Sequence, residues 1–390
     1  MKKIIGSKII IYAFFIKFVL FTGKGIISPL IPLISKELGV GLDYIGSIIS
    51  LSVIALFFVS LTTGNLIEVI GIKKVIYIGF GLNLVGSILL FYSNTFPVFV
   101  IAYFIMRLGI GMIAISLLCL ISTSYPKRKT SSILKAGFGN TAASIISPLL
   151  VSLILFLDSD WRYYYLIHPI FLLILALILW KTEIPRHLRV DTSIKKLFSA
   201  NKKIITNPAF IICGMIILFY ASVMNTFRDW FTSYFTSINI SIDISSIFLS
   251  IFGLAIFFGM LLRNKLIQYF KKKRLLFFSF IISFFLLLGI LLIDNIVTKV
   301  ILVFLFGVAA AGNFTLTFTI SSGILPKYTN TATGITVAFA NAGVIFFQYL
   351  TGYMLEHVSG NSMIYINTSL MLLLIALTAI LNYHKKFQIE

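Results

Sequence analysis

Twelve long apolar runs, separated by short polar segments, make up most of the chain. Six lie at about 9–33, 44–64, 75–93, 97–122, 136–157 and 163–181, and six more at about 207–227, 244–262, 275–293, 300–324, 331–355 and 363–383. Each is long enough to cross the roughly 30 Å hydrocarbon core of a bilayer as an α-helix. A helix keeps its backbone hydrogen bonds internal, as lipid requires. The pattern therefore predicts an all-α membrane protein with twelve transmembrane helices.

The longest polar interval divides these runs into two sets of six. It extends from Lys181 to Asn207 and contains Pro185 and seven basic residues. Two matching halves are typical of repeat-built transporters, whose solute site lies near the middle of the membrane. We therefore predict an N-terminal six-helix bundle at 1–183, a cytoplasmic central loop at 184–206 and a C-terminal six-helix bundle at 207–390.

The composition agrees with a membrane protein and excludes an ordinary soluble domain. Hydrophobic residues make up 59% of the chain, charged residues 11%, and the mean hydropathy is +1.04. Both cysteines, Cys119 and Cys213, lie inside apolar runs, so we expect no disulfide and no metal site. The start Met1-Lys2-Lys3 has the charge of a signal peptide but no small-residue cleavage site follows, so we interpret it as part of the first span.

The net charge of +20 is explained by topology and not by nucleic acid. With the N-terminus in the cytoplasm, 25 of the 32 basic residues fall on the cytoplasmic side. The opposite side holds Lys36, Arg162, Arg228 and Lys299. This asymmetry predicts that both termini are cytoplasmic. It also makes the lipid bilayer, and no nucleic acid, the expected partner of the basic residues, including the Lys271–Arg274 cluster beside the inner leaflet.

The stretch between the second and third runs reads GNLIEVIGIKK and resembles a family signature. In the major facilitator superfamily, a cytoplasmic loop has Gly, three residues, Asp-Arg, one residue, Gly, one residue and then basic residues. Here Glu68 replaces the Asp and Val69 replaces the Arg. The resemblance implies a cytoplasmic gating motif that latches the inward side against the eleventh span. Its residues are Gly64, Glu68, Gly71, Lys73 and Lys74.

Other short motifs extend the resemblance over the whole chain. Arg107 to Gly111 is similar to the family's Arg-x-x-x-Gly motif, Trp161-Arg162 to its Trp-Arg pair, and Gly334 to Gly352 to the glycine-rich span of sugar permeases. Ser144 to Pro148 stands where many members have a Gly-Pro segment, with serines in place of glycines. The resemblance implies the family's fold and alternating access, with spans one to six moving against spans seven to twelve.

Four ionisable side chains fall inside the predicted spans: Lys17, Lys24, Arg107 and His168. All twelve acidic residues fall in loops, tails or span ends, so we expect no carboxylate deep in the membrane. A cation at the bilayer centre costs on the order of 3 kcal/mol on insertion scales. Such a group therefore faces a cavity or a partner, which makes these four candidates for substrate binding or coupling.

The four candidates differ in position. Lys17 and Lys24 share one face of the first span; Lys17 can snorkel to the cytoplasmic end, and Lys24 lies deeper between two glycines. Arg107 either binds substrate or holds a polar network. His168 precedes Pro169 and either makes a helix-packing hydrogen bond or titrates near physiological pH.

Uncharged polar side chains inside the spans add further candidates: Asn140, Asn225, Asn313, Asn341 and Gln348. Asn140 shares a face of the fifth span with Ser144 and Ser147, and Asn341 and Gln348 are seven residues apart in the eleventh. Polar side chains in membranes also join helices to one another. Ligand contact and helix packing therefore both remain open for them.

The combined interpretation is a secondary transporter of a small solute. Buried cations without a buried carboxylate favour a small organic anion as the substrate. The alternative transport functions are a drug or metabolite exporter and a sugar permease. A membrane receptor or scaffold is the alternative outside the transporters. No catalytic constellation appears, so we expect no enzyme activity, no cofactor and no metal. The compact loops and the Lys/Ile/Phe-rich composition favour a bacterial cytoplasmic membrane, and we expect a monomer.

Overall fold

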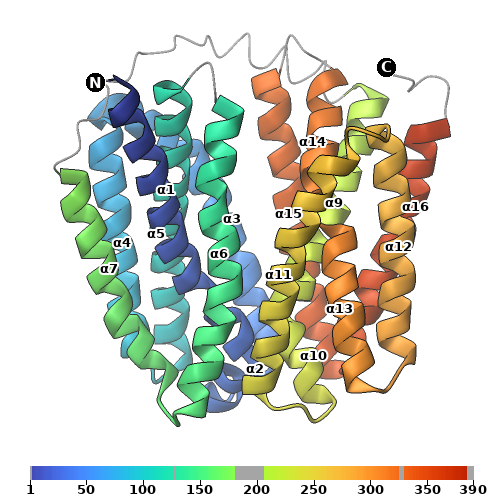
Figure 1. Cartoon of the computed structure of the whole chain (residues 1–390). Helices are drawn as coiled ribbons and strands as arrows, with labels where there is room; N and C mark the ends of the chain where they lie inside the picture. Colours follow the sequence, from blue (N-terminus) through green and yellow to red (C-terminus); the bar gives the residue numbers. More distant parts are fainter. Residues whose placement is uncertain (1, 126–128, 181–205, 325–328, 384–390) are drawn as a thin grey trace. The chain divides into compact units, whose positions relative to one another are not determined.

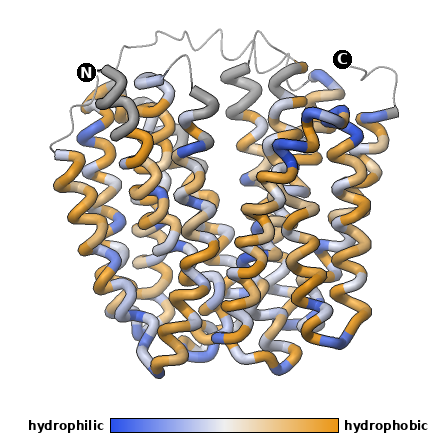
Figure 2. Tube along the Cα trace, in the orientation of Figure 1, coloured by the Kyte–Doolittle hydropathy of each residue, from blue (hydrophilic) through white to orange (hydrophobic). Residues whose placement is uncertain are grey.

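The structure is a computed structural model of the 390-residue chain, and it describes residues 2–125, 129–180, 206–324 and 329–383. Within these ranges every regular element is a helix (Figure 1). Hydrophobic residues predominate along the helices (Figure 2). The predicted all-α class is therefore confirmed, and the cytoplasmic position of both termini stays a prediction.

The chain divides into two compact units. Unit 1 comprises residues 1–41, 51–190 and 240–250, and unit 2 comprises residues 42–50, 191–239 and 251–390. This division departs from the predicted bundles at two short segments, 42–50 and 240–250, which each group with the other unit. The predicted central loop at 184–206 lies, except for its last residue, outside the described residues.

Fifteen α-helices and one 3-10 turn make up the regular structure of the described residues. The helices up to the gap at 181–205 are α1 (Lys2–Gly25), α2 (Ile27–Leu38), α3 (Leu42–Ile70), α4 (Ile72–Phe91), α5 (Phe96–Ser124), α6 (Lys129–Phe156), η2 (Trp161–Tyr163) and α7 (Tyr164–Trp180). After the gap come α9 (Pro208–Asp229), α10 (Phe231–Ser237), α11 (Ile242–Leu266), α12 (Lys272–Leu292) and α13 (Ile296–Ala310). The last three are α14 (Asn313–Ile324), α15 (Thr329–His357) and α16 (Ser362–Tyr383).

All twelve predicted spans correspond to helices. Eleven helical segments among the described residues are long and apolar enough to cross a membrane, judged by length and composition. The remaining prediction, at 44–64, corresponds to α3, a 29-residue helix that contains the apolar stretch Leu42–Leu56. Length and hydropathy, which are local properties, were therefore sufficient to locate every span.

The same helix pairings occur in both units. In unit 1, α1 packs along α6, and α4 packs along α5 and α7. In unit 2, α9 packs along α15, and α12 packs along α13 and α16. Numbered as spans, the pairs in unit 1 are span one with span five, and span three with spans four and six. The pairs in unit 2 are span seven with span eleven, and span nine with spans ten and twelve. The internal repeat suggested by the six-plus-six pattern is thus present in the packing.

Close packing in unit 1 depends on glycines at the interface of α4 and α5. A Cβ on Gly86 would lie 2.5 Å from the Met106 backbone nitrogen, and one on Gly109 would lie 2.6 Å from the Gly79 carbonyl oxygen. Small residues allow helix backbones to approach in a membrane, where dispersion and not the hydrophobic effect drives association. These glycines therefore let α4 and α5 meet along their length.

Two spans predicted as single helices are interrupted. The first breaks at Ile26 between α1 and α2, because Pro29 lacks the N–H that would bond to the Gly25 carbonyl. The tenth breaks between α13 and α14, where Gly312 has a φ of 77°, a conformation that costs glycine little. The interruption in the tenth span leaves carbonyl groups of α13 without helical partners.

The start of α3 is held to α15 within unit 2. The Leu42 N–H donates to Glu356 Oε2 at 2.8 Å, so a carboxylate distant in sequence satisfies an amide in the first turn of α3. His357 Nε2 lies 3.6 Å from Asp43 Oδ2, and Ser50 Oγ donates to the Ile345 carbonyl at 2.7 Å. These contacts explain why residues 42–50 group with unit 2.

Candidate functional site

Arg107 is a buried cation near the middle of a transmembrane helix of unit 1. It lies eleven residues after the start of α5, which is about 16 Å along the helix axis. Its side chain is 4% exposed. Nε donates to Ser52 Oγ at 3.4 Å, and the guanidinium carbon lies 6.0 Å from the centre of the Tyr103 ring. The prediction that α5 carries a cation inside the membrane is therefore supported by its position.

The guanidinium of Arg107 has more donors than the described residues occupy. An arginine carries five N–H donors and no acceptor. Within the described ranges, the Ser52 contact is the one hydrogen bond from this side chain, and its length is near the upper limit for such a bond. Desolvated charge of this kind is costly without a partner. The guanidinium therefore has hydrogen-bond donors that the described residues leave unused.

The two lysines of α1 are half-buried. Lys24 lies in the last turn of the helix and Lys17 lies two turns before it. A lysine in the last turn also interacts favourably with the negative end of the helix dipole. The structure therefore gives Lys24 a structural contribution beside its predicted role in substrate binding, and that role stays a prediction for both lysines.

His168 in α7 has both ring nitrogens engaged. Nδ1 lies 3.1 Å from Ser87 Oγ in α4, and Nε2 lies 3.1 Å from the Val19 carbonyl oxygen in α1. The side chain is 1% exposed. A Cβ on Gly23 would lie 2.7 Å from Nε2, so this glycine makes room for the ring. The geometry favours the packing interpretation of His168 over contact with substrate.

The polar stripe of α6 makes mostly local hydrogen bonds. Ser144 Oγ donates to the Thr141 carbonyl, and Ser147 Oγ donates to the Ala143 carbonyl. Asn140 is half-buried, and its Oδ1 is buried without a hydrogen-bond partner among the described residues. Asn140 is therefore the member of this stripe with capacity left for a ligand.

In unit 2 the predicted residues Asn225 and Gln348 lie in one polar cluster around Asp229. Gln348 Nε2 donates to Asp229 Oδ2 at 2.7 Å, and Arg228 Nε donates to Asp229 Oδ1 at 3.0 Å. Arg228 Nη2 donates to Asn225 Oδ1 at 2.8 Å. Gln348 Oε1 is buried without a partner in the described parts of the chain. The structure thus brings two predicted residues together around a carboxylate that the sequence analysis did not select.

Asp229 is the last residue of α9, in agreement with the expectation that acidic residues fall at span ends, but its side chain is buried. It is 3% exposed. The predicted seventh span at about 207–227 agrees with α9, and helical bonds continue through Trp230 into α10, which ends at Ser237. Asp229 therefore lies eight residues, or about 12 Å, before the end of this helical path. The residues after Trp230 read FTSYFTS, without Gly or Pro, and this absence of a breaker was the available signal.

The remaining predicted side chains fall into different surroundings. Asn313, at the start of α14, is fully buried and donates from Nδ2 to Ser279 Oγ at 2.8 Å. Ser279 in turn contacts Arg263, so Asn313 belongs to a structural network at the interruption of the tenth span. Asn341 in α15 is half-exposed. Ligand contact by Asn313 and Asn341 stays a prediction, and the structure favours a packing role for Asn313.

The predicted gating motif is a tighter turn than its sequence indicated. The helix α3 continues through Gly64 to Ile70, and Gly71, with a φ of 89°, is the one residue between α3 and α4. Lys73 Nζ donates to the Trp180 carbonyl at the end of α7 at 2.8 Å, and Lys74 is exposed. The side chain of Glu68 lies outside the described part of the chain. A gating role for this turn stays a prediction.

Comparison with known proteins decides the family. The profile of the family described as Major Facilitator Superfamily matches residues 13–304 and 236–386, which together cover nearly the whole chain. The chain belongs to the major facilitator superfamily. Transporters of this superfamily are built from internal repeats and bind their substrates near the membrane midplane. The chain is therefore a multi-pass membrane protein of a family of secondary transporters with small-molecule substrates.

Solved transporters of the superfamily share the fold at low sequence identity. A D-xylose–proton symporter superposes with a TM-score of 0.79 at 14% identity, over 96% of this chain and 97% of that one. The nucleoside transporter NupG gives 0.74 at 17% identity, over 96% and 98%. A bacterial homologue of the human lysosomal transporter Spinster gives 0.72 at 14%, over 96% and 95%. A search of curated proteins found no match.

Proposed function

We propose that this superfamily member carries a small organic anion by alternating access, with Arg107 as the group that binds the anionic end. The observation that carries the proposal is a guanidinium that is 4% exposed, lies midway along α5 and has one hydrogen bond among the described residues. Carboxylates and phosphates match the planar fork of arginine through two parallel hydrogen bonds. A substrate anion would add hydrogen-bond partners to the one that the described residues supply.

Lys24 is proposed as a second cationic group in the same unit. It is half-buried in α1, whose neighbour α6 carries the incompletely paired Asn140. A lysine acts as a mobile point charge, whereas arginine fixes orientation. We therefore assign Lys24 to attraction of the anion and Arg107 to its orientation.

A thermal-shift screen of the purified protein tests the proposal. Organic acids are compared with their uncharged amides, because a ligand that binds the folded state raises its melting temperature. The acids and not the amides are expected to stabilise the protein, and Arg107→Gln is expected to weaken the affinity for a stabilising acid about 30-fold or more. Lys36→Gln, which removes an exposed cation from the same unit, is the matched control. Equal affinity of wild type and Arg107→Gln would reject the proposal.

A proton-coupled carrier of a neutral solute, such as a sugar, is the second candidate. The buried carboxylate of Asp229 favours it, since intramembrane acids commonly serve as proton carriers. In this case a pH gradient drives accumulation of an uncharged solute, and Asp229→Asn abolishes accumulation while solute exchange continues. Stabilisation by uncharged solutes in the thermal-shift screen, with no response to organic acids, would favour this candidate over the first.

We further propose that the protein is a monomer in a bacterial cytoplasmic membrane with both termini in the cytoplasm. The excess of basic residues in alternate loops supports the orientation. Reporter fusions at residue 390 and after residue 95 test it. Fluorescence of a cytoplasmic reporter is expected from the first fusion, and alkaline phosphatase activity is expected from the second. The mass of the detergent-solubilised protein by light scattering tests the oligomeric state.

A further inference from the structure

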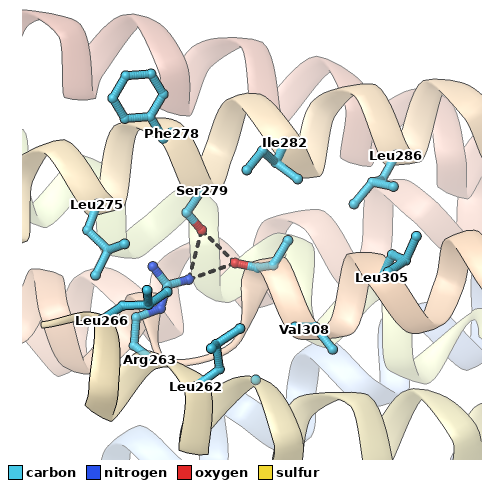
Figure 3. A pocket seen from close by; sticks show the side chains of 12 residues that line it. Leu262, Arg263, Leu266, Leu275, Phe278, Ser279, Ile282, Leu286, Leu305 and Val308 are labelled. Carbon is cyan, nitrogen blue, oxygen red and sulfur yellow. Dashed lines mark hydrogen bonds between the residues drawn. The ribbon is translucent and has the colours of Figure 1, made fainter. Parts of the chain in front are cut away.

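A groove lies between α11, α12 and α13 in unit 2, and its lining includes Arg263 and Ser279 of the network around Asn313. Its volume is about 330 Å³. Apolar side chains line it, among them Leu262, Leu275, Ile282, Leu305 and Val308 (Figure 3). Small-ligand sites begin at about 300 Å³. The groove is thus large enough to hold part of a ligand, and its mostly apolar lining favours an apolar part of that ligand.

The groove lies on a face of unit 2 that remains exposed. Leu262 is 46% exposed, Ile282 is 52% exposed and Leu305 is 45% exposed. All three belong to transmembrane helices, where exposed apolar side chains meet hydrocarbon. The natural occupant of such a groove is therefore a lipid acyl chain.

One end of the groove is strongly basic. Leu275, which lines the groove, directly follows Lys271-Lys272-Lys273-Arg274 at the start of α12, and Leu266 on α11 directly follows Lys265. Lys271, Lys272 and Arg274 are exposed. The sequence between Asp243 and Asp294 contains no acidic residue. The groove therefore begins beside a cluster of positive charge with no acidic residue close to it in the sequence.

The length of the groove fits one leaflet of a membrane. Along α12 its lining extends from Leu275 to Leu286, which are eleven residues or about 16 Å apart. Half of the hydrocarbon core of a bilayer is about 15 Å thick. An acyl chain whose headgroup lies at the basic end would reach the far end of the groove near the bilayer midplane.

The buried Arg263 makes the wall of the groove rigid at its basic end. Its Nε donates to the Ala311 carbonyl at 3.1 Å. Its Nη2 donates to the Ala309 carbonyl at 2.7 Å and to Ser279 Oγ at 2.9 Å (Figure 3). These bonds join α11, α12 and α13, the three helices that form the groove. The groove is therefore fixed by hydrogen bonds between its walls before any ligand enters.

We propose that this groove is a binding site for an anionic phospholipid, with one acyl chain along α12 and the phosphate beside Lys271, Lys272 and Arg274. Charge selects the headgroup, because basic residues at a membrane surface attract anionic lipids. The apolar walls hold the chain. The site is separate from Arg107 and Asp229, so it is independent of which solute the protein carries.

Native mass spectrometry of the purified full-length protein tests the proposal. The protein is mixed with equal amounts of phosphatidylglycerol and phosphatidylcholine that carry the same acyl chains. Retention of phosphatidylglycerol over phosphatidylcholine is expected. The double variant Lys271→Gln/Lys272→Gln is expected to weaken phosphatidylglycerol binding about fivefold for each charge removed, without a change in phosphatidylcholine binding.

A large side chain placed in the groove distinguishes lipid binding in the groove from nonspecific lipid contact with the rest of the surface. Ile282→Trp is expected to reduce retained phosphatidylglycerol, whereas Phe285→Trp is not, since Phe285 is 62% exposed on the same helix but does not line the groove. Leu305→Trp, on the opposite wall, replaces Ile282→Trp if that variant does not fold. Equal retention by the groove-filling variant and Phe285→Trp, or equal retention of the two lipids by the wild type, would overturn the proposal.

Discussion

Gln348 in α15 donates a hydrogen bond from Nε2 to Oδ2 of Asp229 in α9 at 2.7 Å, and both side chains are buried. The two helices pack along each other, so this bond lies inside the interface that corresponds to the α1 and α6 pair of unit 1. The carboxylate also accepts from Arg228. A buried ionised group depends on such partners, because losing one leaves charge uncompensated.

The variant Gln348→Leu is expected to destabilise the protein by about 1–3 kcal/mol, because it removes a hydrogen bond to a buried charge. Thermal unfolding in detergent measures the change. Asn341→Leu is the matched control, seven residues earlier on the same face of α15 and half-exposed, and it is expected to have a much smaller effect. The loss from Gln348→Leu should shrink in an Asp229→Asn background; an equal loss there would show that the two residues are not coupled.

Two glycines of α4 provide a matched pair for testing helix packing. A Cβ on Gly86 would lie 2.5 Å from the Met106 backbone nitrogen, whereas one on Gly81 meets no heavy atom within 4 Å. Gly86→Ala is therefore expected to cost about 1–3 kcal/mol through forced separation of α4 and α5. Gly81→Ala is expected to be neutral or slightly stabilising, since alanine favours the helix. Similar melting temperatures for the two variants would contradict the described packing of α4 on α5.

A substitution of His168 tests whether this side chain packs helices together or takes part in proton-coupled transport. Because Ser87 and the Val19 carbonyl occupy its ring nitrogens, we expect His168→Gln to change stability and to leave the pH profile of transport unchanged. The loss of stability is expected to be about 1–2 kcal/mol, one hydrogen bond or slightly more. Transport is measured in proteoliposomes across pH 5 to 8, the range in which histidine commonly titrates. A shifted pH profile would return His168 to the candidate coupling residues.

Arg263 is expected to be a structural cation. It donates to carbonyl groups at the end of α13 that the interruption at Gly312 leaves without helical partners. Arg263→Met should therefore lower stability by about 2–4 kcal/mol, since charge-assisted bonds to buried carbonyls are lost. Lys265→Met, two residues later and exposed, should leave the melting temperature nearly unchanged. Equal effects in the two variants would refute the structural role of Arg263.

The outline of the fold could be predicted from the sequence because hydropathy and length are local properties. The six-plus-six division was likewise visible in one long polar interval. Local pattern did not reveal where helices are interrupted, as at Gly312, because that interruption is stabilised by Arg263 from another helix. Arg263 directly follows the predicted eighth span at about 244–262 and is 6% exposed.

The candidate residues could likewise be selected by local sequence pattern, but their contacts with other helices could not. Arg107 and His168 were selected because a cation or an imidazole inside an apolar run is unusual, and both are buried. Asp229 was not selected because it lies at the end of its span, and its burial depends on contacts with another helix. Each of the three also has a partner on another helix, namely Ser52, Ser87 and Gln348, and one sequence does not contain that information.

Uptake into liposomes tests the central claim, that Arg107 binds an anionic substrate, most directly. Liposomes that contain wild type, Arg107→Gln or Lys36→Gln are given a radiolabelled organic acid that stabilises the wild type, beside its uncharged amide. The account predicts uptake of the acid and not of the amide by wild type and Lys36→Gln, and a loss of acid uptake of about 30-fold or more in Arg107→Gln. Undiminished acid uptake by folded Arg107→Gln, or equal uptake of acid and amide by the wild type, would contradict it.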